Sequence, residues 1–230
     1  MTISNDSRAR IKKTVEPIAL GMGRLGLTPD ALTIAGFAIT VVGAVLIAQQ
    51  LWLVGGLVIL FGGVFDMFDG TLARATGRVS NLGAFMDSVF DRASEAVVYL
   101  GIIVGLEAVE VLHGTALAAA TMGSAMLVSY VRSKAEGLGF VPDSRMAAVG
   151  VMPREVRLVI LSLGLVLAGV LGTLPDASSC ATCAGGASLA PGVLALFVAL
   201  GAITLGSTLT VIQRILHVRR QAIHHSNQNP

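Results

Sequence analysis

The sequence contains few charged residues and few aromatic residues. Of its 230 residues, 13% are Asp, Glu, Lys or Arg and 5% are Phe, Trp or Tyr. A soluble domain carries roughly 25% charged residues, so the composition argues against an ordinary soluble protein. Nucleic-acid binding needs clustered basic residues beside aromatic side chains. Despite a net charge of +2, we therefore expect no nucleic-acid partner.

Cysteine is also scarce, because Cys180 and Cys183 are the only two in the chain. A CxxC pair can be a redox motif or half of a zinc site. No second CxxC and no His pair with ligand spacing completes a zinc site. We interpret the pair as a small disulfide or as two idle thiols in a loop outside the membrane; its redox state stays open.

Long apolar segments are abundant. Hydrophobic residues make up 54% of the chain and the mean hydropathy is +0.79. A transmembrane helix needs about 20 mainly apolar residues, and six segments meet this need. The predicted spans are residues 31–48, 51–73, 82–106, 116–131, 156–174 and 192–215. The sequence therefore predicts an all-α integral membrane protein with six transmembrane helices and membrane lipids around it.

The basic residues predict the orientation. When the six spans alternate across a membrane, all 16 Lys and Arg residues fall on one side. The loops on the other side, around residues 49–50, 107–114 and 175–191, contain none. Since Lys and Arg collect on the cytoplasmic side, we expect a multi-pass cell-membrane protein whose two termini are both cytoplasmic.

The N-terminal segment predicts a juxtamembrane helix. Ile11, Val15 and Ile18 follow helical spacing, while Arg8 and Lys12 suit anionic headgroups, as in an amphipathic helix on the membrane surface. A frayed tail followed by an ordinary core helix is the alternative. The whole chain, 1–230, is predicted to be one membrane domain: an amphipathic segment at 1–25, a six-helix bundle at 26–218 and a cytoplasmic tail at 219–230.

Four aspartates lie on the second and third predicted spans. Asp66 and Asp69 are three residues apart, and Asp87 and Asp91 are four apart, so each pair shares one helix face. The short turn between these spans makes them antiparallel neighbours whose faces can meet. Four carboxylates at membrane depth cost several kcal/mol per buried charge unless a cation lies between them. Oxygen ligands suit Mg²⁺ or Mn²⁺, so the pattern predicts a divalent metal site.

Small residues and an arginine accompany the aspartates. Gly70, Ala73 and Gly83 let a ligand approach the backbone closely. Arg74 can donate two parallel hydrogen bonds to a phosphate group. Metal ions, arginine and accessible backbone together describe a site for a diphosphate.

The motif formed by these residues resembles the signature of the CDP-alcohol phosphotransferase family. It runs D-x-x-D-G-x-x-A-R from Asp66 to Arg74, then eight residues, then G-x-x-x-D-x-x-x-D from Gly83 to Asp91. The resemblance implies a homodimeric enzyme with two Mg²⁺ or Mn²⁺ ions and Asp91 as the general base. The metal ligands it implies are Asp66, Asp69, Asp87 and Asp91. The residues it implies for binding the CDP-linked donor are Asp66, Asp69, Gly70, Ala73, Arg74 and Gly83.

A second polar group lies at the predicted cytoplasmic ends of the fourth and fifth spans. Its members are Ser129, Arg132, Lys134, Arg154 and Arg157. An arginine pair three residues apart near a helix start can hold a phosphorylated acceptor. Flanking of spans by positive charge also explains each basic residue.

These segments, with LTPDALT at 27–33, resemble the phosphatidylinositol phosphate synthase branch of the family. The branch usually has Arg at the place of Lys134 and Glu at the place of Pro153. The resemblance predicts transfer of a phosphatidyl group from CDP-diacylglycerol to inositol phosphate, with release of CMP, in phospholipid biosynthesis. Glycerol phosphate, serine or CDP-inositol as the second substrate, and an archaeal CDP-lipid as donor, are alternatives. A membrane prenyltransferase and a cation transporter are the alternatives outside the family.

Overall fold

The computed structural model describes residues 17–18, 20–24, 26–108, 111, 113–140, 149–172 and 190–226, without the side chains of residues 66, 67 and 224–226. Six long helices and no strand occur in this part of the chain. They are α2 (Pro29–Ala48), α3 (Trp52–Ala75), α4 (Asn81–Ala108), α5 (Gly114–Gly137), α7 (Arg154–Leu171) and α8 (Pro191–Ser226). Each overlaps one predicted span, so the prediction of an all-α fold is confirmed for this part of the chain.

Four of the six helices are long and apolar enough to cross a membrane. These are α2, α3, α5 and α8, the last over Pro191–Ile223. The remaining two, α4 and α7, carry charged residues within otherwise apolar sequence, such as Asp91 and Glu95 in α4 and Arg157 in α7. Charge inside a membrane helix is costly and marks function, so α4, α7 and the part of α3 with Asp69 and Arg74 are the places in which to look for a site.

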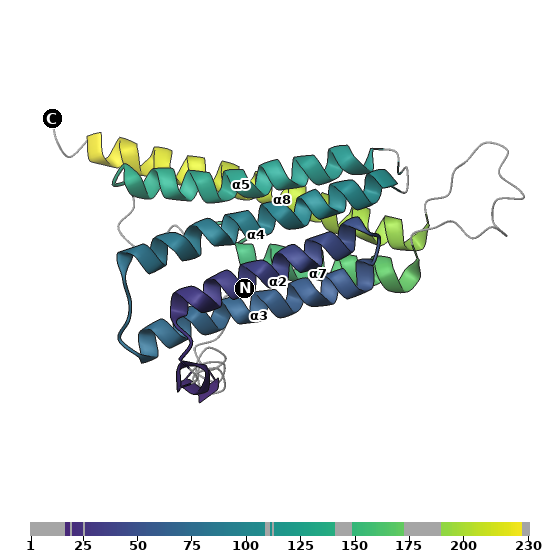
Figure 1. Ribbon diagram of the computed structural model, residues 1–230. Helices are drawn as coiled ribbons and strands as arrows, with labels where there is room; N and C mark the ends of the chain where they lie inside the picture. The colour runs from purple at the N-terminus through teal and green to yellow at the C-terminus, as the bar shows by residue number, and fades with distance from the viewer. Residues whose placement is uncertain are drawn as a thin grey trace, which may run out of the picture.

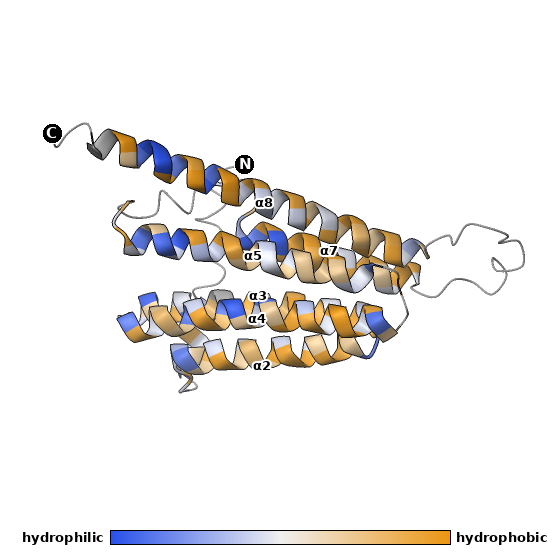
Figure 2. Ribbon diagram, turned by 90° about the horizontal axis from the view of Figure 1, so that it is seen from above, coloured by the Kyte–Doolittle hydropathy of each residue, from blue (hydrophilic) through white to orange (hydrophobic). Residues whose placement is uncertain are grey.

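The helices form a closed ring. The principal packing pairs are α2 with α3 and α4, α7 with α3 and α8, and α5 with α4 and α8. All six run lengthwise, and the α2–α3 and α4–α5 connections lie at the end opposite to the α3–α4 connection and the C-terminus (Figure 1). Hydropathy colouring shows apolar residues along most of the helices and polar ones gathered toward their ends (Figure 2). The ring therefore encloses an interior that neighbouring helices can line with polar groups.

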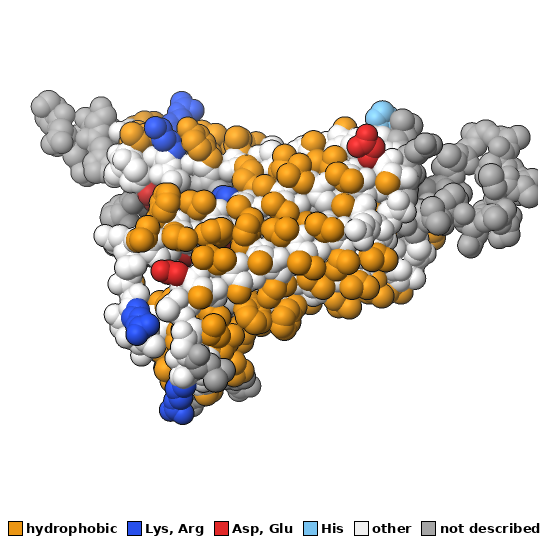
Figure 3. All heavy atoms as spheres, in the orientation of Figure 1, with side chains coloured by type: hydrophobic (Ala, Val, Ile, Leu, Met, Phe, Trp, Pro, Cys, Tyr) orange, Lys and Arg blue, Asp and Glu red, His pale blue; other side chains and the backbone are white. Residues whose placement is uncertain are grey.

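The outer surface has the distribution of a membrane protein. On the face shown in Figure 3, apolar side chains cover the middle and Lys and Arg gather toward one end. Exposed apolar residues are spread over all six helices, for example Val45, Leu57, Leu100, Val170 and Leu205. Large exposed apolar surfaces are unusual on soluble monomers, and here they fit contact with lipid.

Local sequence explains where the helices begin and end. Thr28 Oγ1 accepts a hydrogen bond from the Ala31 amide at 3.2 Å, and Pro29 takes the first position of α2, as helix starts favour. The α7 helix ends at Gly172, whose φ of 80° suits glycine. Gly101 lets α4 pack closely on α2, because a methyl group there would collide with the Ala44 carbonyl.

The two ends of the chain were predicted to form a juxtamembrane helix and a cytoplasmic tail. Residues 17–18 and 20–24 are helical, within the segment predicted as the juxtamembrane helix, while Ile11 and Val15 lie outside the described residues. Cys180 and Cys183 lie outside them too. The α8 helix has 36 residues and is about 54 Å long, so the predicted tail at 219–230 begins as its continuation.

Candidate functional site

A pocket of about 260 Å³ lies among the adjoining ends of α2, α3 and α4. It gathers six of the residues predicted to bind donor or metal, which are Asp69, Gly70, Ala73, Arg74, Gly83 and Asp87. We call it the donor pocket. The three atoms nearest to a methyl group added at Gly70 all belong to the Arg74 guanidinium, the first at 3.5 Å. Glycine at position 70 therefore leaves room directly beside the arginine.

Asp69 is the most deeply buried carboxylate of the donor pocket, at 4% exposure. Thr33 Oγ1 donates to its Oδ2 at 2.6 Å, and the Gly70 amide donates to its Oδ1. Donors to both oxygens orient the carboxylate and offset part of its desolvation. Thr33 belongs to the LTPDALT segment, where nothing in the sequence alone indicates a role in the site.

The donor pocket fits a hard divalent cation. Asp69 and Asp87 both line it, and carboxylate oxygens are the ligands that Mg²⁺ and Mn²⁺ prefer. Among the described side chains, no three acidic, His or Cys residues are grouped closely enough to hold an ion. Asp66 lies on α3, three residues before Asp69, but its side chain is outside the described part. Its contribution stays a prediction.

Asp91 lies one helical turn beyond Asp87 and forms ion pairs with two arginines. Its Oδ1 forms an ion pair with Arg154 Nη1 at 2.6 Å, and its Oδ2 lies 3.2 Å from Arg92 Nη1. The side chain is only 13% exposed. The two guanidinium groups offset its charge and fix its direction.

A second pocket, of about 140 Å³, begins at Asp91 and lies among α4, α5, α7 and α8. It brings together four of the five residues predicted for the acceptor, which are Ser129, Arg132, Arg154 and Arg157. We call it the acceptor pocket. The fifth, Lys134, is exposed on α5 and lines neither pocket.

Arg214 also lines the acceptor pocket, although it is not among the residues predicted for the site. It lies on α8 and is 4% exposed. Its Nη1 donates to the Val128 carbonyl at 2.6 Å and its Nε to the Val149 carbonyl at 3.0 Å. Its sequence signal was an arginine within the last predicted span, where an ionisable residue indicates function. It had been counted only as flanking charge.

The two pockets meet on α4, where Asp87 faces one and Asp91 the other. The donor pocket combines carboxylates, an arginine and accessible backbone, which suits a metal-bound diphosphate. The acceptor pocket is rich in arginine, which suits a phosphate group. A carboxylate between a diphosphate and a phosphate-bearing molecule can accept a proton from the latter.

Comparison with known proteins agrees with this geometry. Residues 26–205 match the family model for CDP-alcohol phosphatidyltransferase. The chain is 35% identical to a phosphatidylinositol phosphate synthase of Cutibacterium acnes, over 93% of this chain and 96% of that protein. It is also 35% identical to an archaetidylinositol phosphate synthase of Pyrococcus horikoshii, over 67% of this chain and 77% of that protein.

Solved structures show the same likeness. The phosphatidylinositol phosphate synthase of Mycobacterium tuberculosis is 28% identical and superposes with a TM-score of 0.72. Its complex with manganese and citrate covers 89% of this chain and 88% of that one, and its complex with CDP-DAG covers 90% and 94%. The motif from Asp66 to Asp91, the ring of helices and these matches lead to one conclusion: the chain belongs to the CDP-alcohol phosphatidyltransferase family of membrane enzymes.

Proposed function

We propose that this enzyme transfers a phosphatidyl group from CDP-diacylglycerol to a hydroxyl group of inositol phosphate and releases CMP. The observation that carries the proposal is the place of Asp91, between the donor pocket and a pocket lined by Arg132, Arg154 and Arg214. Several arginines around one pocket suit an acceptor that carries a phosphate group. The likeness to phosphatidylinositol phosphate synthases, one of them solved with CDP-DAG, supports the same substrates.

The residues of the two pockets divide the reaction between them. Arg74 and the open backbone at Gly70 bind the diphosphate of the donor, and the acceptor pocket binds the phosphate of inositol phosphate. Asp91 takes the proton from the attacking hydroxyl. The new bond joins that oxygen to the lipid-linked phosphorus, the bond from this phosphorus to the bridging oxygen breaks, and CMP leaves with the bridging oxygen.

The proposal includes two Mg²⁺ or Mn²⁺ ions. Asp66, Asp69, Asp87 and Asp91 would hold them. Bound at this place, such ions neutralise the charge that develops on the phosphoryl oxygens and on the leaving CMP. Thr33 fixes the direction of the Asp69 carboxylate. The solved relative that contains manganese supports a metal-dependent site.

We further propose that all six helices cross the membrane and that one domain, with its bundle at 26–218, forms the enzyme. Both pockets lie toward the end of the bundle that carries the α3–α4 connection (Figure 1). Lys and Arg gather toward the same end in Figure 3. By the positive-inside rule, this end and both termini face the cytoplasm, where a soluble acceptor is available. The family resemblance supports a homodimer.

A second candidate keeps the reaction and changes the donor. The likeness to an archaetidylinositol phosphate synthase favours an archaeal CDP-lipid with the same acceptor. Glycerol phosphate, serine and CDP-inositol are further candidates for the second substrate, because Lys134 and Pro153 depart from the pattern of the branch. Membership of the family removes the prenyltransferase and transporter alternatives.

A purified-enzyme assay tests the proposal. The enzyme is supplied with Mn²⁺ or Mg²⁺, CDP-diacylglycerol and, separately, inositol phosphate, inositol, glycerol phosphate or serine, and CMP release is measured. We expect release with inositol phosphate at least about tenfold faster than with inositol, because losing one charge-assisted hydrogen bond already costs about that factor. Equal rates with both, or release only with glycerol phosphate or serine, would refute the acceptor assignment.

A further inference from the structure

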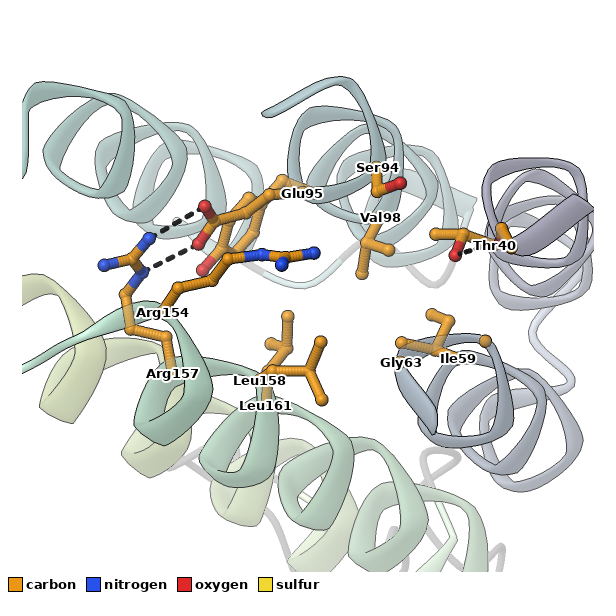
Figure 4. A pocket seen from close by; sticks show the side chains of 13 residues that line it. Thr40, Ile59, Gly63, Ser94, Glu95, Val98, Arg154, Arg157, Leu158 and Leu161 are labelled. Carbon is orange, nitrogen blue, oxygen red and sulfur yellow. Dashed lines mark hydrogen bonds and ion pairs between the residues drawn. The ribbon is translucent and has the colours of Figure 1, made fainter. Parts of the chain in front are cut away.

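A buried ion pair joins α4 to α7 inside the ring. Arg157 is 2% exposed and the Glu95 side chain 10%. Arg157 Nε lies 2.7 Å from Glu95 Oε1 and Nη2 lies 2.8 Å from Oε2, so both carboxylate oxygens are engaged. Figure 4 shows the two dashed contacts at one side of a small cavity, with Arg154 beside them.

This pair repeats the Asp91–Arg154 pair one turn deeper. Glu95 follows Asp91 by four residues on α4, and Arg157 follows Arg154 by three residues on α7. The two acidic residues therefore share one face of α4, and the two arginines share one face of α7. The α4 and α7 helices are not among the principal packing pairs. Two ion pairs, stacked one above the other, therefore connect helices that face each other across the ring.

Arg157 also fixes the segment that leads into α7. Its Nη1 donates to the Met152 carbonyl at 3.1 Å. On the other side, the amides of Val151 and Met152 donate to Thr210 Oγ1 at 3.1 and 3.0 Å. Gly150, with φ of 126°, lies so close to Thr210 that a side chain there would collide with it. The segment is held from α8 by Thr210 and from α4 through Arg157.

Arg154 is the second residue after Met152, so its place depends on these contacts. A buried ion pair seldom adds net stability compared with apolar packing, and in some proteins it fixes one arrangement instead. Here the arrangement that it fixes is the start of α7 against α4. Arg154 Nη1 then reaches Asp91 at 2.6 Å while the same side chain lines the acceptor pocket.

We propose that Glu95 and Arg157 are positioning residues, which set the place of Arg154 beside Asp91 and thereby the affinity for the acceptor. The inference rests on the proposed function and deepens it. The sequence had suggested that Arg157 binds the acceptor phosphate directly. In the structure Arg157 donates two hydrogen bonds to Glu95 and one to the Met152 carbonyl, so Arg157 acts through Arg154.

Glu95→Gln distinguishes two possible roles of Arg157, which are positioning of Arg154 and direct binding of the acceptor. It keeps the size of the side chain and removes its charge. If Arg157 positions Arg154, the variant raises the KM for the acceptor about tenfold, the effect of weakening one charge-assisted contact, and leaves the KM for CDP-diacylglycerol unchanged. If Arg157 binds the acceptor directly, the variant frees Arg157, and an unchanged or lower acceptor KM would overturn the inference. An equal rise in both KM values would also overturn it, because it indicates a general structural role.

A double-mutant cycle gives the second test. We expect Glu95→Gln, Arg157→Gln and the double variant to raise the acceptor KM by about the same factor. Either change alone already breaks the ion pair between the two residues, so the second change has little left to remove. Effects that multiply in the double variant would contradict the inference. Glu107→Gln is the matched control, because Glu107 lies exposed at the far end of α4. If an Arg157 variant does not fold, Glu95→Gln and the milder Glu95→Asp carry the test alone.

The wild-type enzyme distinguishes this inference from the proposed function. If wild type releases no CMP with inositol phosphate, the proposed acceptor is wrong, and the same KM measurements are made with the acceptor that it uses. If wild type is active and Glu95→Gln binds that acceptor normally, the positioning role alone is wrong.

Discussion

The donor pocket and the acceptor pocket are built in different ways. The donor pocket is formed by residues 29–87, which belong to α2 and to the hairpin of α3 and α4. The acceptor pocket draws on four helices, from Asp91 on α4 to Arg214 on α8. The donor chemistry therefore depends on one local motif, whereas recognition of the acceptor depends on how distant helices pack. Changes in α5, α7 or α8 can alter the acceptor while the donor chemistry stays the same.

The largest expected effect is at the donor pocket. Asp69→Asn is expected to lower kcat/KM about four-thousandfold, because metal-assisted charge stabilisation is worth about 5 kcal/mol and each 1.4 kcal/mol changes a rate tenfold. The measurement is CMP release over a range of Mn²⁺ concentrations, together with binding of CDP-diacylglycerol. Exposed Glu107→Gln should keep full activity. Normal Mn²⁺ dependence of the Asp69 variant would exclude this residue as a ligand.

Asp91→Asn tests the boundary between the pockets. Loss of a general base lowers kcat about a thousandfold. Binding of the donor is retained, because Asp91 lines only the acceptor pocket of the two and Asp66, Asp69 and Asp87 are left to hold the ions. Binding of CDP-diacylglycerol and the rate of CMP release are measured on the same preparation. Normal CMP release would exclude Asp91 as the base. Loss of donor binding would mean that the two pockets are not separable at α4.

The local motif is the part of the site that the sequence could predict. Asp69, Gly70 and Arg74 lie within two turns of one helix, and Asp87 lies on the next helix after a short turn. Helical spacing and antiparallel pairing were enough to place them together. The fold was predictable for the same reason, since each apolar segment forms its helix from local sequence, although the true end of α8 lies eleven residues beyond the predicted residue 215.

Contacts between distant helices could not be predicted in this way. Nothing in the spacing of Glu95 and Arg157, 62 residues apart, pairs them. Arg214 reaches Val128 over 86 residues and had the appearance of a flanking charge. Lys134 shows the opposite case, a residue that was predicted for the pocket but does not line it. Its basic neighbours suggested a common pocket, but its direction on α5 leaves it exposed. Side-chain direction at a helix end depends on packing that the spacing of one segment does not contain.

Arg154→Ala is expected to act on the acceptor side only. It removes a guanidinium that lines the acceptor pocket, and the loss of a charge-assisted hydrogen bond raises the acceptor KM about thirtyfold. The KM for CDP-diacylglycerol should not change. Arg219→Ala, at an exposed position on α8, is the matched control for loss of one positive charge. If the acceptor KM of the Arg154 variant is unchanged, the assignment of the second pocket is wrong.

The smallest expected effect concerns Thr33, which lies outside the family motif but donates to Asp69 Oδ2 at 2.6 Å. Thr33→Val keeps the shape and removes the donor. Groups that orient a metal ligand typically change metal affinity ten- to a hundredfold, so we expect the Mn²⁺ concentration for half-maximal activity to rise about tenfold with an unchanged acceptor KM. Thr208→Val is the control, because its hydroxyl bonds only to the Thr204 carbonyl on exposed α8 surface. A rise in acceptor KM instead would show that Asp69 also affects binding of the acceptor. The two pockets would then not act separately.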